Sequence, residues 1–136
     1  MSTEENKELV RRMFDETFNK GNTDPIYELI AADYMDHSPI PAPAPGPEGF
    51  AKRTTALRAA FVQEAEFGVF LAEGGLVAFT WTFNGVHNGP FAGIPATGKN
   101  VSLAGINVER FKDGKIVEHW SHFDLAGLLK QITGNS

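Results

Sequence analysis

The segment with the most evident chemical content lies near the C-terminus, where Trp120, His122 and Asp124 occupy alternate positions. If this segment is a β-strand, the three side chains share one face, because the side chains of a strand alternate between its two faces. A histidine and an aspartate on one face can exchange protons with a bound molecule, which is general acid–base chemistry. Asp is depleted in strands, and a buried carboxylate is costly unless it is paired or protonated. Asp124 is therefore either an acid–base group or the N-cap of the segment that starts at Leu125, and the pattern favours neither.

The register of the last hairpin determines the neighbours of these side chains. A two-residue turn at Asp113-Gly114 would place Glu109 opposite Glu118, and like charges so placed destabilise a sheet. A three-residue loop that begins at Lys112 and ends in a left-handed glycine shifts the register by one residue and brings Arg110 near Glu118. We expect this second register.

This register sorts the residues of the last two strands between two faces. Ala104, Ile106, Val108 and Arg110 join the face of Trp120, His122 and Asp124, which we expect to be the pocket face. The other face carries His119, Ser121 and Phe123. His119 is therefore expected on the outer side of the sheet or at a subunit contact.

The two remaining histidines lie near loops. His87 ends a predicted strand beside a glycine-rich loop, so it is either a pocket-rim residue or a solvated turn residue. His37 follows the second predicted helix and is either a hydrogen-bonded structural residue or a pocket residue. The sequence has no H-x-H or H-x-x-x-H pair, so no metal site is expected. It also lacks Gly-x-Ser-x-Gly and a phosphate-binding glycine loop.

Helical and strand periodicities predict three helices followed by an antiparallel meander. The first helix begins with a capping box at Ser2 and Glu5, the second opens at Asp24-Pro25, and the third runs from Pro47 to about Gln63. Residues 34–37 form a brief strand or an extended stretch, and the proline-rich residues 38–47 are expected to be a connector rather than a lid. The four strands are expected at Glu66–Ala72, Leu76–His87, Lys99–Phe111 and Lys115–Asp124.

This order predicts an α+β fold with one domain over residues 1–136, since no βαβ alternation is present. The helices should cover one face of the sheet, and glycines inside long strands should curve it and leave a hollow. The chain has 11 Phe and 2 Trp, more than a solid core of this size needs. We therefore expect a cavity bounded by Phe14, Phe50, Leu57, Trp81, Phe83 and Trp120.

Composition argues against several classes of partner and location. The net charge is −5 and no basic run occurs, so nucleic-acid binding is not expected. No apolar run approaches the roughly 20 residues that span a bilayer, and the polar N-terminus does not resemble a signal peptide. Cysteine is absent, which fits a reducing compartment, and we expect a cytoplasmic protein.

Several segments together resemble one known family. They are Tyr34–Pro39, Gly46–Phe50, Trp81–Phe83 leading to Gly85–Gly89, Gly93–Lys99 and Asp113–Trp120. The set is similar to the SnoaL-like polyketide cyclases, often called ester cyclases, of the nuclear-transport-factor-2-like (NTF2-like) superfamily. The resemblance implies a cone in which a curved antiparallel sheet wraps around N-terminal helices and encloses a pocket, as in NTF2-like and cystatin-like folds.

The same resemblance implies a reaction and a site. Family members close a polyketide ring by intramolecular aldol condensation, without metal or cofactor. Their acid–base group is an Asp at the end of the last strand with a His two residues before it, which Asp124 and His122 match. His37 matches a polar pocket position. The implied ligand is a small polyketide-like or other apolar carbonyl compound, and the implied assembly is a homodimer or homotetramer.

An aromatic pocket would serve this chemistry, because walls formed by Trp81, Phe83 and Trp120 would raise the pKa of the Asp124 carboxyl group. Phe14, Phe50 and His87 complete the predicted substrate-binding set. The fold alone does not determine the function. An isomerase or hydrolase, a non-catalytic binding protein, and a scaffold with a vestigial pocket remain alternatives. For self-association, the outer sheet face is expected to present Thr80, Thr82, Asn107, His119 and Ser121.

Overall fold

The structure is a computed structural model that describes residues 2–134, without the side chains of residues 62 and 63. The N-terminal elements are α1 (Thr3–Phe14), a π-helical turn η1 (Asp15–Asn19), α2 (Asp24–Leu29), β1 (Ile30–His37) and α3 (Gly46–Ala60). The remaining elements are β2 (Phe61–Glu73), β3 (Leu76–His87), β4 (Asn100–Lys112), β5 (Lys115–Phe123) and α4 (Leu125–Thr133). No helix among residues 2–134 is long and apolar enough to cross a membrane.

The first helix forms as its sequence predicts. The Ser2 hydroxyl accepts a hydrogen bond from the Glu5 backbone N–H, and the Glu5 side chain accepts one from the Ser2 N–H, which completes the capping box. The apolar stripe of α1 is buried through Val10, Met13 and Phe14. The chain then turns at Gly21, whose φ of +75° lies in the left-handed region that glycine adopts at low cost.

The sheet has five strands in the order β1-β5-β4-β3-β2. Strands β2 to β5 form the expected antiparallel meander, and β1 adds a fifth strand parallel to β5. The stretch at 34–37 is therefore the end of a longer strand. Helix α3 ends at Ala60 and β2 starts at Phe61, several residues earlier than the sequence predicted. Phe61 is buried against Phe83 and Phe91, which ties this residue to the sheet.

The hairpin between β4 and β5 brings Arg110 to Glu118 and sorts the side chains into the predicted two faces, but the loop and the direction of the one-residue shift differ from the prediction. Arg110 lies opposite Glu118, and its Nε is 3.2 Å from Glu118 Oε1. The turn has two residues, Asp113 and Gly114, both with positive φ. The one-residue shift comes instead from a β-bulge at Val117, since Phe111 pairs with Ile116 and Arg110 with Glu118.

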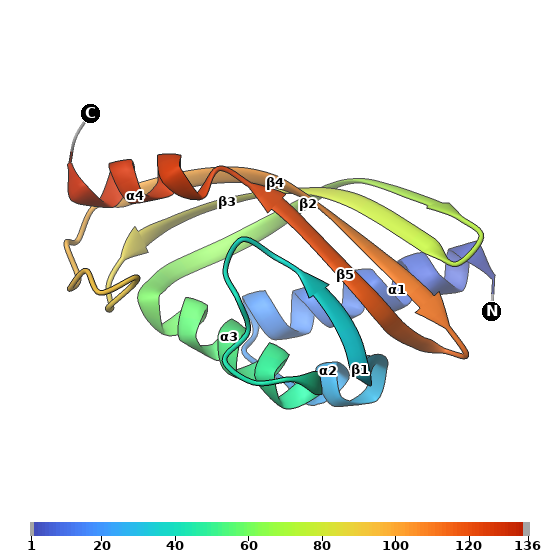
Figure 1. Ribbon diagram of the computed structural model, residues 1–136. Coiled ribbons are helices and arrows are strands. Elements are labelled where there is room, and N and C mark those ends of the chain that lie inside the picture. The colour runs from blue at the N-terminus through green and yellow to red at the C-terminus, as the bar shows by residue number, and fades with distance from the viewer. Residues whose placement is uncertain (1, 135–136) are drawn as a thin grey trace.

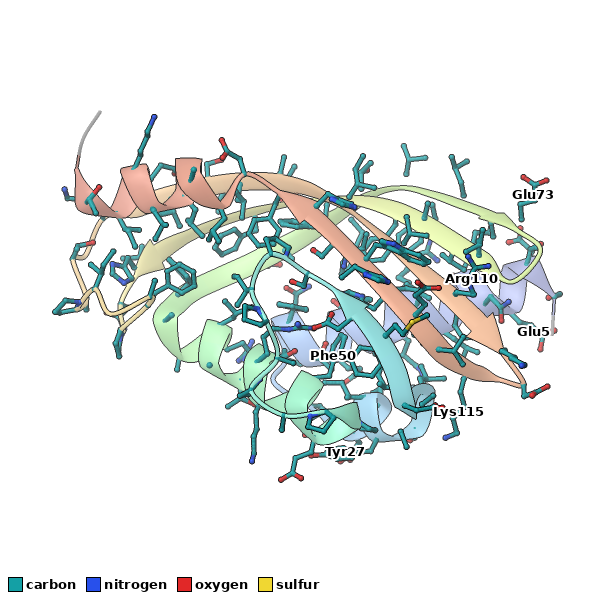
Figure 2. The ribbon with its side chains drawn as sticks, viewed as in Figure 1. Glu5, Tyr27, Phe50, Glu73, Arg110 and Lys115 are labelled. Carbon is teal, nitrogen blue, oxygen red and sulfur yellow. The ribbon has the colours of Figure 1, made fainter. Side chains whose placement is uncertain are left out.

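The helices lie on one side of the curved sheet. Figure 1 shows α1, α2 and α3 together beneath the strands and α4 at another end of the sheet, beside β4. The main core forms between α1, α3 and the facing strands, around residues such as Met13, Phe50 and Phe79. Figure 2 shows Phe50 in the space between the helices and the strands. A second apolar cluster, which includes Phe83, Leu128 and Ile132, lies where α4 meets the sheet.

Candidate functional site

A cavity of about 110 Å³ lies between the sheet and the helices. Its lining is mostly aromatic and aliphatic, as in sites for small apolar ligands. Polar side chains also reach it: Ser38, Arg53, Thr54, Asn107, His119 and Ser121. Among the described residues that line it there is no Asp or Glu. The polar groups therefore determine what chemistry this cavity can perform.

Most of the predicted cavity wall lies where the sequence placed it. Phe14, Phe50, Leu57, Trp81 and Phe83 all line the cavity. Their place follows from the apolar stripes of α1 and α3 and from the apolar face of β3. That they bind a substrate stays a prediction.

The prediction that the Trp120 face of β5 lines the cavity is wrong. The helices cover the aromatic face of β3. Residues that lie directly opposite each other in neighbouring strands share a face, and Phe79 lies opposite Asn107, which lies opposite Ser121. Asn107 and Ser121 are therefore on the covered face. The residues between these positions therefore point outward, and Trp120 and His122 lie on the uncovered face. The same register overturns the expectation that Asn107, His119 and Ser121 face outward, because all three line the cavity.

Asp124 lies outside the cavity and caps α4. Its Oδ1 accepts a hydrogen bond of 2.8 Å from the Gly127 backbone N–H, and the residue is exposed. Of the two interpretations that the sequence left open, the structure shows the N-cap. The aromatic walls that were expected to raise its pKa do not surround it.

His37 also lies on the outer face. Its Nε2 is 2.7 Å from Glu118 Oε2, and its ring stacks on Trp120 with 5.2 Å between centroids. The hydrogen bond from His37 lowers the pKa of Glu118. Arg110 completes this outer-face cluster, with its guanidinium 5.6 Å from the Trp120 ring centroid.

His87 is buried but does not line the cavity. Its Nδ1 lies 2.9 Å from Thr97 Oγ1, so it holds the loop between β3 and β4 in place. Its ring packs against Phe61, 5.4 Å away between centroids. The structure thus gives His87 neither the rim position nor the solvated position that the sequence suggested.

The polar end of the cavity is built from β1, α3, β4 and β5. His119 Nδ1 lies 2.6 Å from Glu109 Oε1, and these two residues are direct cross-strand neighbours. Arg53 on α3 pairs with Asp36 through both guanidinium amines, one of them at 3.3 Å, and donates to the Ile40 carbonyl at 3.0 Å. His119 Nε2 lies 4.0 Å from Asp36 Oδ1, beyond hydrogen-bond distance. One ring nitrogen of His119 is therefore occupied by Glu109, and the other has no such partner.

Burial controls the charges of this cluster. Glu109 has no exposed surface and His119 has 3%. Burial raises the pKa of Glu109 well above its ordinary value and lowers that of His119 to about 3, with the nearby Arg53 guanidinium lowering it further. Both shifts favour the uncharged form. Burial likewise raises the pKa of Tyr34, which lies beside this cluster, to about 12.

A second hydrogen bond orients the wall of the cavity beside His119. Trp81 Nε1–H donates to Asn107 Oδ1 at 2.9 Å. Because this bond uses the amide oxygen, the Asn107 amide nitrogen keeps its two donors for other partners. Asn107 can therefore serve as a hydrogen-bond donor next to His119.

Comparisons with known proteins agree with the fold and with the cavity. Residues 8–132 match the family model of the SnoaL-like polyketide cyclases. The chain belongs to the SnoaL-like polyketide cyclase family. It is 37% identical over 133 residues to the aklanonic acid methyl ester cyclase DauD of Streptomyces sp. (strain C5), covering 92% of this chain and 80% of that protein.

Two further relatives support the assignment to this cyclase family. The nogalonic acid methyl ester cyclase of Streptomyces nogalater is 32% identical over 118 residues, covering 85% of this chain and 88% of that protein. The crystal structure of a SnoaL-like protein from Jannaschia Sp. CCS1 superimposes with a TM-score of 0.87, covering 96% of this chain and 93% of that one. At 24% identity this last likeness concerns the fold alone. The protein is an enzyme of the polyketide cyclase type.

Sequence reasoning missed the His119–Glu109 pair in this cyclase. The apolar residues Val77, Phe79, Trp81 and Phe83 marked the inner face of β3, and that signal could have located the inner face of β4 had the β3–β4 register been known. Polar side chains on β4 and β5 instead suggested an outer face. Among the residues whose side chains are described, no group of three or more His, Asp and Glu residues converges as a metal site.

Proposed function

We propose that this cyclase closes a ring in a small polyketide-like carbonyl compound by intramolecular aldol condensation, inside the cavity and without a metal or cofactor. Its curated relatives are cyclases of aklanonic and nogalonic acid methyl esters, so methyl esters of polyketide acids are the proposed substrate class. One observation carries the proposal. His119 and Arg53 are the only ionisable groups among the described residues that line an otherwise largely apolar cavity, and of the two only His119 has a ring nitrogen that can take up and return a proton.

The reaction needs a base that removes a proton from carbon and later returns it to the new alkoxide. Carbonyl groups on both sides of that carbon acidify it, which is why the step needs no metal. We assign the proton transfer to Nε2 of His119, because Nδ1 is occupied by Glu109. Hydrogen-bond donors beside it, the Asn107 amide and the Ser121 hydroxyl, would stabilise the enolate oxygen as its charge develops.

This assignment replaces Asp124 and His122 by His119. The family pattern pointed to the first two residues, but Asp124 is exposed and caps α4, and His122 points away from the cavity. An acid–base group has to lie within hydrogen-bond reach of the atom it serves. Of these three residues, only His119 lines the cavity and can contact a molecule bound there.

The size of the cavity adds a condition. Its volume of about 110 Å³ is smaller than the roughly 150 Å³ of a cavity that holds benzene. A substrate with several rings therefore has to displace part of the lining. The lining includes Ser38 and Ile40 of the proline-rich segment and Leu128 of α4, which lie outside both the sheet and the main core. We expect these segments to move when substrate binds.

The test is turnover of aklanonic acid methyl ester and nogalonic acid methyl ester by the purified protein. We expect His119→Gln to lower kcat by about 10²–10⁴-fold, the usual contribution of a general acid–base group. The matched control is His122→Gln, which makes the same change on the same strand but on the outer face. A fully active His119→Gln variant, or loss of activity in the control alone, would contradict the assignment. A wild-type protein that binds both esters without converting them would instead be a binding protein.

We also propose that the protein self-associates through the outer face of the sheet, as the sequence suggested, but through different residues. Met35 and Ile106 are large apolar side chains on this face and are 54% and 49% exposed. Thr80 and Thr82 remain part of the proposed contact, because they lie opposite Ile106 and Ala104. Sedimentation at micromolar concentration should show at least a dimer, and a monomer would refute the proposal. A cytoplasmic location stays a prediction from the absence of cysteine.

A further inference from the structure

We propose that Glu109 is a positioning residue that lets His119 act as both base and acid, by exchanging a proton with Nδ1 whenever Nε2 gains or loses one. The inference rests on the proposed function. It adds a second residue to the site and states which atom holds each proton at each step. Glu109 does not line the cavity, so it acts through His119 and not on the substrate.

The geometry of the pair carries the inference. Glu109 on β4 and His119 on β5 are paired in register, so the sheet itself holds their side chains together on the covered face. The contact between Oε1 and Nδ1 is 2.6 Å, the length of a strong hydrogen bond. The other carboxylate oxygen, Oε2, is buried and has no hydrogen-bond partner among the described residues. Burial of a carboxyl group with a single histidine partner lowers the stability of the fold, so a functional role is needed to explain it.

The reaction explains what that task is. A histidine that takes up a proton becomes an imidazolium, and a buried cation is strongly disfavoured. In the ready state Glu109 is a carboxylate that accepts the Nδ1–H of neutral His119, and Nε2 carries a lone pair. Nε2 takes the carbon-bound proton of the substrate while the Nδ1 proton passes to Glu109. The pair is then uncharged and the substrate is an enolate.

The second half of the cycle restores the ready state. The enolate carbon forms the new carbon–carbon bond, and the attacked carbonyl oxygen becomes an alkoxide. Nε2–H gives its proton to this alkoxide while Glu109 returns a proton to Nδ1. No proton is gained or lost over the cycle, and no other reactant is needed.

The groups around the Glu109–His119 pair are compatible with both of its states, the ready state with one proton and the state with two protons. Three other charged or titratable groups lie beside the pair, Asp36, Arg53 and Tyr34, and His37 acts on His119 electrostatically from the outer face. Arg53 and Asp36 are hydrogen-bonded to each other and largely neutralise one another. His119 Nε2 is left 4.0 Å from Asp36 and free of that pair. The raised pKa of Glu109 agrees with this scheme, because it makes the carboxylate a stronger proton acceptor than usual.

The first test is the pH profile of kcat for Glu109→Gln on aklanonic acid methyl ester. In the wild type, kcat should rise with pH as the pair loses its second proton. The variant cannot take the Nδ1 proton, so we expect kcat to fall by at least about tenfold and to lose this rise. Glu118→Gln is the matched control, because it removes a carboxylate from the outer face of the same hairpin. A folded Glu109→Gln protein with the wild-type rate and profile would overturn the inference.

The second test needs no variant at Glu109. In protein labelled with ¹⁵N-histidine, the ring nitrogen shifts of His119, assigned with His119→Gln, report which nitrogen carries the proton. We expect the Nε2–H form at low pH and a change to the Nδ1–H form as the pair ionises. A single tautomer over the range of about pH 5 to 9 would overturn the inference. If His119→Gln is itself active, the proposed function fails. If only the results for Glu109 contradict the expectation, the inference about Glu109 fails and the proposed role of His119 is unaffected.

Discussion

The buried Glu109–His119 pair should shape the stability of the protein as a function of pH. In the unfolded chain these groups titrate near their ordinary pKa values of 4.5 and 6.5. In the folded protein the pKa of Glu109 is raised and that of His119 is lowered to about 3. Above pH 4.5, for as long as Glu109 keeps its proton in the folded protein, the folded pair holds one proton on Glu109 and the unfolded pair holds one on His119 up to pH 6.5. The two states bind equal numbers of protons there, so the pair adds no slope.

Outside this window the two groups act in opposite directions. Below pH 4.5 the unfolded pair binds one proton more than the folded pair, so the pair's contribution to stability falls as the pH is lowered toward 3. Wherever Glu109 keeps its proton in the folded protein after both groups have ionised in the unfolded chain, the folded pair binds one proton more, so the contribution falls as the pH rises. Each unit of pH changes the free energy of unfolding by about 1.4 kcal/mol per proton.

Glu109→Gln isolates the contribution of the carboxyl group. The variant has nothing to protonate at this position, whereas the other titrating groups are common to both proteins. The lowered pKa of His119 comes from burial and Arg53, so it persists in the variant. The free energy of unfolding of Glu109→Gln should therefore rise relative to wild type with increasing pH above 4.5, until Glu109 ionises in the folded protein.

Urea unfolding of both proteins at several pH values between about 5 and 8 measures this difference. The difference should increase with pH for as long as folded Glu109 keeps its proton, and it should level off once Glu109 ionises in the folded protein. Glu118→Gln, on the outer face, should show no such increase with pH. A difference between wild type and Glu109→Gln that stays constant with pH would refute the claim that folded Glu109 keeps its proton above its ordinary pKa.

Three further perturbations test other parts of the structure. Asp124→Asn should keep activity and stability, because an amide can cap a helix, whereas Asp124→Ala should cost about 0.5–2 kcal/mol in thermal unfolding; an inactive Asn variant would restore Asp124 as a catalytic candidate. Gly105→Ala should lower both stability, by about 1–3 kcal/mol, and kcat, because a Cβ there would overlap the Trp81 ring and lie 2.8 Å from the His122 carbonyl oxygen; unchanged kinetics would show that the Trp81 position does not matter. Ile106→Glu should shift sedimentation toward monomer without loss of fold, and an unchanged mass would place any contact elsewhere.

The sequence by itself determined the elements, their order and the α+β class. Local signals were sufficient for these, since capping, glycine positions and periodicity act within a few residues of the chain. The proximity of Arg110 to Glu118 was also predictable, because it avoids a pair of like charges across the hairpin. The bulge at Val117 was not predictable, because an extra residue in the loop and an extra residue in the strand both put the same side chains on each face.

Only the tertiary structure decided which face of β4 and β5 is covered. Periodicity shows which side chains share a face, but the choice of the covered face depends on the pairing of β3 with β4 across a long loop. The helices cover the aromatic face of β3, and pairing carries polar Asn107 and His119 under the same helices. The polarity of these residues predicted that they would be exposed to solvent, but the strand pairing places them beside the cavity and places Trp120 on the outer face. A cavity that performs acid–base chemistry has to bury such groups, so hydrophobic patterning failed at this polar part of the interior.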